Sequence, residues 1–246
     1  MPKICDSHIH VGDFFGGIRF CPEEVASLCE LQCIDKFLFF QTAADLRFLP
    51  RYEQFLRDVE KMHELLGKDK AIPALWIPFC ELKNLKKYWK DEFAALKIHP
   101  AVEKALSDSN YKYAMELAAD TGVPLIIHTS YDDEYSCLRF AKIAEAIDNL
   151  KLVLAHGRPF EKCVKALQIS KNIFADTAYM PPVEAKKILE AGYGNQLIFG
   201  SDFPLDRFHF PSENPTARYS KFKDEMARIL PKCALSQNFN FLFVKH

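Results

Sequence analysis

The sequence predicts a (β/α)8 barrel of the TIM type, and three observations favour this fold class. The chain has 246 residues, close to the length of about 250 residues that is typical of a single barrel of this kind. Short apolar runs alternate with amphipathic stretches along the chain, as expected when strands buried on both faces are each followed by a helix. Polar residues that can bind metal ions recur at the ends of the apolar runs. We therefore expect one barrel domain over residues 1–246.

Eight apolar runs of strand length are the predicted barrel strands. They are Ile4–Val11, Ile34–Gln41, Ala71–Phe79, Phe93–Pro100, Pro124–Thr129, Leu152–Gly157, Ile173–Ala178 and Leu197–Pro204. Eight β/α units in strict alternation favour a closed parallel barrel over an open doubly wound sheet. The number of apolar runs, eight, is therefore the observation that favours the barrel.

The segments between these runs carry helix signals. Pro22 stands at a first helical position, and Gly67, Gly122 and Gly192 follow helical stretches as C-terminal caps. The predicted helices are one that begins at Pro22, then Arg51–Leu66, Glu81–Lys90, Tyr111–Thr121, Tyr135–Ile147, Phe160–Ile169, Pro182–Ala191, Thr216–Leu230 and a closing helix at Leu235–Val244.

Composition narrows the class of protein. The net charge of -1 and the pI of about 6.7 leave no basic footprint for nucleic acid or an anionic membrane. No apolar run reaches membrane-spanning length. The eight cysteines include no CxxC pair, which argues against a zinc finger or a disulfide scaffold. We expect a cytoplasmic protein that acts on a small-molecule substrate.

The stretch Asp6-Ser7-His8-Ile9-His10 is the main indication of a metal site. Alternate side chains of a strand share a face, so we expect Asp6, His8 and His10 to point the same way. Two imidazoles so placed can hold one divalent cation, and Asp6 could orient them through hydrogen bonds. A pair of buried, hydrogen-bonded histidines is the structural alternative for this stretch taken alone.

Later strands supply the remaining candidates, because chemistry in such barrels lies at the C-terminal ends of the strands. The fourth run ends in Lys97 and His99, the fifth in His128, the sixth in His156 and the eighth in Asp202. We predict that one divalent cation, with zinc favoured over manganese or iron, is bound by His8, His10, His128 and Asp202. Asp202 would accept a proton from a metal-activated water, and His156 would polarise the substrate oxygen.

The five strand-end motifs DSHIH, LKIHP, IIHT, LAHG and FGSDFP together resemble the signatures of the amidohydrolase superfamily. They are most similar to the branch of amidohydrolase-related hydrolases and aminocarboxymuconate-semialdehyde decarboxylase-like enzymes. The resemblance covers essentially the whole chain. It implies a (β/α)8 barrel with metal on His8, His10, His128 and Asp202, and with His156 at the catalytic or second-metal position. Because a carbamylated lysine at the end of the fourth strand bridges two metals in binuclear members, Lys97 and His156 are candidates for a second metal, although one metal per subunit is favoured. A homodimer is left open.

Three further residues are candidates for substrate contact. Arg158 follows His156-Gly157 where relatives commonly have a second glycine, and a guanidinium suits a carboxylate or phosphate. A structural ion pair is the alternative for Arg158. The other two candidates for substrate contact are Lys97, through its ammonium group, and Phe14, which lies in the loop after the first strand. His99 is expected to be a hydrogen-bonded core histidine.

The leading functional hypothesis is a metal-dependent hydrolase of a C–N or C–O bond (amide, lactone or ester) in a small, perhaps anionic, substrate. The alternative with the same ligands is a metal-dependent non-oxidative decarboxylase of a small carboxylic acid. A non-catalytic ligand-binding barrel ranks lower, because every strand-end ligand is present. A nuclease of the related TatD type is disfavoured, since that group carries a glutamate where this chain has Lys97.

Overall fold

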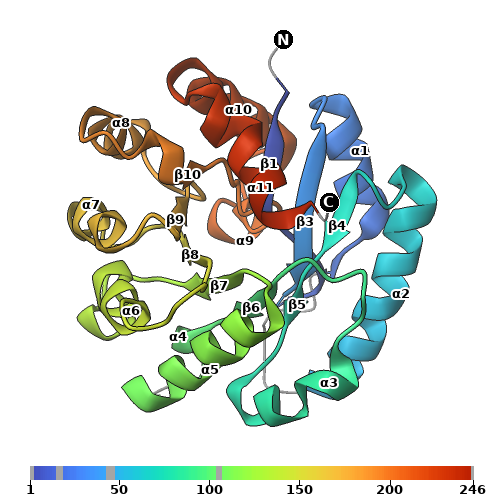
Figure 1. The fold of residues 1–246 in the computed structure, drawn as a ribbon. Helices are drawn as coiled ribbons and strands as arrows, with labels where there is room; N and C mark the ends of the chain where they lie inside the picture. Colours follow the sequence, from blue (N-terminus) through green and yellow to red (C-terminus); the bar gives the residue numbers. More distant parts are fainter. Residues whose placement is uncertain (1–2, 15–18, 43–47, 104–106, 245–246) are drawn as a thin grey trace.

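In the computed structural model, which describes residues 3–14, 19–42, 48–103 and 107–244, the strands run through the middle of the molecule and the helices ring them (Figure 1). Each of the eight predicted runs contains a strand. The strands are β1 (Cys5–Asp13), β3 (Lys36–Gln41), β4 (Ala71–Pro73) with its continuation β5 (Leu75–Trp76), β6 (Leu96–Ile98), β7 (Leu125–His128), β8 (Leu152–Ala155), β9 (Ile173–Asp176) and β10 (Leu197–Ile198). The predicted (β/α)8 fold class is confirmed.

The strands form two sheets, in the orders β2-β1-β3-β4 and β10-β9-β8-β7-β6-β5. All pairs are parallel except the short strand β2 (Arg19–Phe20), which runs antiparallel to β1. The third predicted strand breaks at Ala74, whose N–H donates to the Phe39 carbonyl at 2.8 Å. Its neighbour Leu75 donates to the Ala95 carbonyl at 3.0 Å, so this strand belongs to both sheets.

On the opposite side, the chain that follows β10 is hydrogen-bonded to β1. The N–H of Asp202 donates to the His8 carbonyl at 2.8 Å, and the N–H of His10 donates to the Phe203 carbonyl at 2.7 Å. An isolated parallel bridge joins Ile9 to Phe203. His8 and Asp202, two residues of the candidate metal site, are therefore held together by backbone hydrogen bonds between β1 and the segment that follows β10.

The helices follow the predicted order with some different ends. They are α1 (Pro22–Leu31), α2 (Phe48–Leu66), α3 (Leu85–Tyr88), α4 (Pro100–Glu103), α5 (Asp108–Thr121), α6 (Cys137–Ala144), α7 (Phe160–Ile169), α8 (Pro182–Glu190), α9 (Asp206–His209), α10 (Pro215–Ile229) and α11 (Asn238–Phe243). The predicted helix over Tyr135–Ile147 is shorter as α6, because Tyr135 lies in a 3-10 turn and Ser136 Oγ accepts a hydrogen bond from the Arg139 N–H as an N-terminal cap. The predicted helix over Glu81–Lys90 is a 3-10 turn followed by the single turn α3.

The inside of the barrel is filled by a compact apolar cluster. It joins strand residues such as Leu38, Ile126, Val153 and Ile198 to side chains of α11. The contributors from α11 are Phe239, Leu242 and Phe243. Because the cluster also contains Cys5 and Ile72, from the beginnings of their strands, α11 closes the N-terminal end of the barrel. The polar residues are left at the other end.

A one-residue bulge in β1 decides which side chains reach that end. Asp6 pairs with Phe37 and Ile9 pairs with Phe39, so β1 advances by three residues over a distance in which β3 advances by two. Asp6 consequently faces the surrounding helices, where its carboxylate accepts a hydrogen bond from the Tyr219 hydroxyl of α10 at 2.9 Å. The prediction that Asp6 shares a face with His8 and His10 is therefore wrong, because alternation along a strand holds only where the register is regular.

Candidate metal centre

The predicted strand-end residues meet in one small cavity at the C-terminal ends of the strands. The cavity measures about 50 Å³. It is lined by His8, His10, Phe14, Thr42, Lys97, His99, His128, His156, Asp202 and Leu205. Thus Lys97 and Phe14 do face the same space as the candidate ligands, whereas Arg158 lies outside its lining.

Both histidines of the first strand approach the carboxylate of Asp202. Its Oδ1 lies 3.0 Å from His8 Nε2 and 2.9 Å from His10 Nε2. Neither contact has the geometry of a hydrogen bond, so among the described residues this buried oxygen has no donor. One ligand atom each from His8, His156 and Asp202 also lie within 4.8 Å of one another. The tightest group of potential ligands therefore contains His156, which we predicted beside the metal, with His128 one contact further out.

The tautomers of His8 and His10 follow from what their other nitrogens touch. His8 Nδ1 lies 2.7 Å from Asp176 Oδ2, and His10 Nδ1 lies 3.4 Å from the carbonyl of Gln41. Carboxylate and carbonyl oxygens only accept, so each Nδ1 carries the hydrogen and each Nε2 presents a lone pair. With both rings neutral, two lone pairs face a carboxylate oxygen within 3.0 Å, an arrangement that repels itself unless a proton or a metal cation lies among them. The donor set thus fits a divalent metal ion.

His128 is connected to this group through His156. His156 Nδ1 lies 3.2 Å from the Ala178 carbonyl, and its Nε2 lies 3.1 Å from His128 Nδ1. By the same reasoning the His128 Nδ1–H donates to His156 Nε2, which leaves His128 Nε2 as a lone pair. The ring of His99 stacks on that of His128 with centroids 3.8 Å apart. His99 Nδ1 has no hydrogen-bond partner in the described part of the chain, so the expectation of a hydrogen-bonded core histidine is wrong.

Charge states in the cavity suit metal binding. Burial lowers the pKa of His10 and of His128, and lowers that of His156 to about 3, so these rings are neutral near pH 7. Burial alone would raise the pKa of Asp202, but the approach of His8 and His10 holds it well below its usual range. Neutral imidazoles and an ionised carboxylate are the protonation states that a metal ion requires of its ligands. His8 differs, because burial and Lys97 lower its pKa but Asp176 and Asp202 raise it above the usual value, so a metal ion would displace a proton from this ring.

Asp176 at the end of β9 is the functional residue that the sequence reasoning missed. Its Oδ2 accepts from His8 Nδ1, and its Oδ1 accepts from the N–H groups of His156 at 2.8 Å and Ala178 at 3.1 Å. Burial would raise the pKa of Asp176, but the charge of His8 lowers it to about 2. A signal was present, because Asp176 is a polar residue at the end of the seventh apolar run. Asp176 orients His8, the task predicted for Asp6.

The backbone at the site is unusual in two ways. His156 and Asp202 have φ angles of 70° and 66°, in the left-handed region that costs a residue with a side chain about 1 kcal/mol or more. A Cβ on Gly200 would lie 3.0 Å from both His8 Cβ and Ser7 Oγ. A glycine at this position therefore lets the end of the last strand lie against β1.

Lys97 brings a buried ammonium to the lining of the cavity. Its side chain is 2% exposed, and its Nζ lies 4.8 Å from the centre of the Phe40 ring. Nζ has no hydrogen-bond partner among the described residues. Burial lowers the pKa of Lys97 to about 8. A buried cation of this kind favours an anionic or strongly polar occupant of the cavity.

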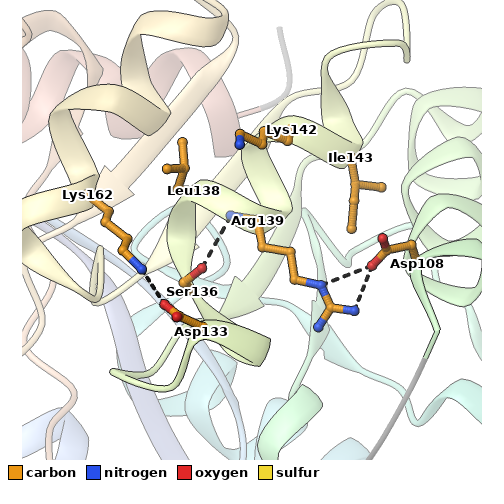
Figure 2. A pocket seen from close by; sticks show the side chains of 8 residues that line it. All are labelled: Asp108, Asp133, Ser136, Leu138, Arg139, Lys142, Ile143 and Lys162. Carbon is orange, nitrogen blue, oxygen red and sulfur yellow. Dashed lines mark hydrogen bonds and ion pairs between the residues drawn. The ribbon is translucent and has the colours of Figure 1, made fainter.

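A larger hollow of about 450 Å³ lies elsewhere, between α5, α6 and α7 (Figure 2). Arg139 pairs there with Asp108 at 2.6 Å, and Lys162 pairs with Asp133. These charges satisfy one another, and none of the strand-end candidates lines the hollow. We therefore place the candidate chemistry in the smaller cavity.

A (β/α)8 barrel with a histidine–aspartate cluster at its strand ends defines a class of protein, and comparison of the sequence identifies the family. A family model described as amidohydrolase matches residues 82–229, more than half of the chain, so the chain belongs to the amidohydrolase family. No curated protein sequence matches it. In the described residues no helix has the length and apolarity to cross a membrane.

Solved structures agree with this fold. A probable 2-pyrone-4,6-dicarboxylic acid hydrolase from Acinetobacter baumannii, with citric acid bound, has a TM-score of 0.73 at 14% identity, covering 98% of this chain and 99% of that chain. Amidohydrolase 2 from Bifidobacterium longum subsp. infantis has a TM-score of 0.68 at 11% identity, covering 98% of each chain. A 4-oxalomesaconate hydratase from Rhodopseudomonas palustris has a TM-score of 0.65 at 15% identity, covering 98% of this chain and 95% of that chain. At these identities the likeness concerns the fold alone.

Proposed function

We propose that this protein is a metal-dependent hydrolase that cleaves a C–N or C–O bond of a small amide, lactone or ester. The observation that carries the proposal is the convergence of two imidazole Nε2 atoms on Asp202 Oδ1, a buried oxygen that accepts no hydrogen bond from the described residues. The amidohydrolase superfamily usually binds a divalent metal, and a nitrogen-rich set with one carboxylate suits zinc first, then manganese or iron.

A bound divalent cation would supply a water of lowered pKa as the nucleophile. His8, His10 and Asp202 would hold the cation, with His128 or His156 completing the set. Asp202 would accept the proton of the attacking water and pass it to the leaving group. Its low pKa means that it holds this proton only briefly.

His156 has two proposed roles, and its hydrogen bond supports one of them more than the other. With Nδ1–H donated to the Ala178 carbonyl, Nε2 is an acceptor and has no hydrogen to offer a substrate oxygen. A ligand role for His156 needs no change of tautomer, but it would use the Nε2 lone pair that accepts the His128 Nδ1–H. The polarising role predicted from the sequence requires the ring to exchange tautomers. Lys97 Nζ, which carries hydrogens and faces the cavity, is the better donor toward a substrate oxygen.

Metal content tests the first part of the proposal. We expect about one equivalent of zinc, manganese or iron per chain, removable with a chelator and restored on dialysis against the ion. The double variant His8→Ala, His10→Ala should lose it, and Asp120→Asn, on the exposed face of α5, should keep it. A content of two equivalents would instead indicate a second metal at Lys97 and His156, with Lys97 carbamylated. Absence of metal from protein purified and refolded with these ions would contradict the proposal.

Asp202→Asn tests the chemistry. A panel of lactones, amides and esters gives the wild-type turnover, and the variant should lose about 10²-fold or more because it lacks the proton acceptor. Circular dichroism should show an unchanged fold. Activity of Asp202→Asn within about tenfold of the wild type would rule out this role for the carboxylate.

A non-oxidative decarboxylase is the second candidate, supported by the buried ammonium of Lys97 beside the same ligands. A substrate carboxylate would leave as carbon dioxide, its bonding electrons would stay on carbon, and a proton from Lys97 or water would replace it. Carbon dioxide release from small carboxylic acids, assayed beside the lactone and amide panel, separates the two reactions.

We keep the cytoplasmic location as a proposal. It is supported by the eight cysteines, all of which are free thiols.

A further inference from the structure

Arg158 occupies a fixed position on the turn that follows β8. Its backbone N–H donates to Thr129 Oγ1 at 2.8 Å, and its carbonyl accepts from the Cys137 N–H at 2.7 Å. Both bonds tie the turn to the segment that follows β7. The backbone of Arg158 is therefore held in place two positions after His156, one of the three potential metal ligands that lie close together.

The guanidinium of Arg158 lies over two tyrosine rings from the neighbouring loops. Its Cζ is 5.4 Å from the centre of the Tyr131 ring, after β7, and 5.9 Å from that of Tyr179, after β9. Such contacts with ring faces hold the flat group in one plane. The hydrogen-bonding edge of the guanidinium is left for another partner.

No partner for this charge is found in the described part of the chain. Arg139 reaches Asp108 at 2.6 Å, and Arg207 reaches Glu24 at 3.0 Å. Arg158 has no carboxylate within ion-pair distance among the described residues, and its buried Nε lacks a hydrogen-bond acceptor. The alternative of a structural ion pair, left open by the sequence, therefore finds no support in these residues. A half-buried guanidinium without an anion is a group whose burial is costly until a ligand supplies one.

Arg158 does not line the cavity, but the Tyr179 ring connects it to the cluster. The Tyr179 ring is 6.3 Å from the His156 ring and nearly parallel to it, at 22°. The charge of Arg158 is one of the causes that lower the pKa of His156. An anionic group held on Arg158 would thus lie beside the Tyr179 ring, and a small substrate that extends from there into the cavity would reach His156 and Asp202.

We propose that Arg158, flanked by Tyr131 and Tyr179, binds a carboxylate of the substrate, so that the enzyme acts on small acids carrying this group a few bonds from the atom attacked. The reaction in this proposal rests on the proposed function, whereas the binding of a carboxylate by Arg158 does not. One guanidinium matches the single charge and the two oxygens of a carboxylate. A phosphate monoester dianion would be left half-neutralised, and among the described residues no second cation faces Arg158 within the same pair of rings.

The test uses the metal-loaded protein and matched ligand pairs, namely succinate, glutarate and adipate, each against its monoamide. The monoamide keeps one carboxylate, which can still reach the metal, and replaces the other by a neutral group. Isothermal titration calorimetry should give a preference for at least one diacid of about 10-fold or more in the wild type. Arg158→Gln should abolish this preference, and Arg158→Lys should retain part of it, because it keeps the charge but loses the paired donors.

Arg57→Gln is the matched control, since Arg57 lies exposed on α2 and contacts only Gln54 among the described residues. It should leave the preference unchanged, and all variants should keep the wild-type circular dichroism spectrum and metal content. An unchanged preference in Arg158→Gln would overturn the proposal, as would a wild type that prefers none of the three diacids.

A kinetic arm separates this proposal from the proposed hydrolase. Arg158→Gln should raise KM for 4-nitrophenyl hydrogen glutarate about 10-fold or more and leave KM for 4-nitrophenyl butyrate unchanged. If the wild type cleaves neither ester nor any compound of the lactone and amide panel but shows the diacid preference, the hydrolase fails and the subsite stands. If it cleaves both esters and Arg158→Gln treats them as the wild type does, the subsite fails and the hydrolase stands.

Discussion

Asp176→Asn is the substitution that tests the organisation of the site most directly. The pKa of Asp176 falls from 3.8 to about 2 on folding, and each unit is worth 1.36 kcal/mol, so the ionised carboxylate stabilises the metal-free protein by about 2 kcal/mol. Because the folded pKa is the lower one, this stabilisation is present above about pH 4 and is lost as the pH falls towards 2. The amide of asparagine carries no charge and offers one acceptor where the carboxylate offers two. We expect the free energy of unfolding at pH 7 to fall by about 2 kcal/mol.

The same change should weaken metal binding. The Nδ1–H of His8 would lose its 2.7 Å contact with a carboxylate, and with it the orientation that directs Nε2 at Asp202. Loss of such a supporting group typically lowers metal affinity about 10- to 100-fold. Competition with a chromophoric chelator measures the affinity, and urea unfolding of the metal-free protein measures the stability. Asp120→Asn, exposed on α5, controls for the loss of one charge.

Two outcomes would refute parts of this reasoning. If Asp176→Asn binds the metal within about threefold of the wild type, the carboxylate does not orient His8 for a ligand role. If the urea midpoint is also unchanged, the low pKa of Asp176 does not reflect its contacts in the folded protein.

Two other substitutions have expected outcomes of opposite sign. Burial lowers the pKa of Lys97 from 10.5 to about 8, so keeping this lysine charged at pH 7 costs about 3 kcal/mol. Lys97→Met should therefore raise the free energy of unfolding of the metal-free protein by up to this amount. The same variant should lose turnover. Stability of the wild type should rise between about pH 8 and 10.5, and urea titrations of Lys97→Met should lack this rise; its presence in the variant would assign it to another group. Gly200→Ala should destabilise the protein by about 1 to 3 kcal/mol and lower its metal content, because the new Cβ would meet His8 Cβ and Ser7 Oγ at 3.0 Å. Thermal unfolding and elemental analysis measure both effects, and a variant equal to the wild type in both would show that β1 can move away without cost.

The strand ends could be predicted from the sequence because buried parallel strands are apolar, so a histidine or aspartate inside such a run is conspicuous. His8, His10, His128 and Asp202 were found in this way, and all of them line one cavity. Their roles as ligands remain predictions. Asp176 carries the same signal, but its run contains no histidine, and a single aspartate at a strand end indicates a metal site less specifically than an imidazole does.

Asp6 could not have been placed correctly from the sequence. The alternation rule assigns it to the face of His8 and His10, and the bulge between Asp6 and Ile9 moves it to the other face. A bulge arises from the pairing of β1 with strands on both sides, and local residues do not record that pairing. The predicted strand order brings the loops after β7, β8 and β9 side by side, but which side chains of these loops contact Arg158 depends on loop conformations that the sequence pattern does not record.

The bulge has an electrostatic consequence that connects the fold to the site. Burial raises the pKa of Asp6 to about 6, although Ser201, His8 and Tyr219 donate hydrogen bonds to it, because no imidazole stands beside its carboxylate. Asp176 is equally buried, and its contact with His8 takes its pKa in the opposite direction. Buried carboxylates of one chain thus differ by which face of the barrel wall they occupy. The ones that face the histidines stay ionised through the neutral range, so the negative charge that a cation requires is in place before any cation binds.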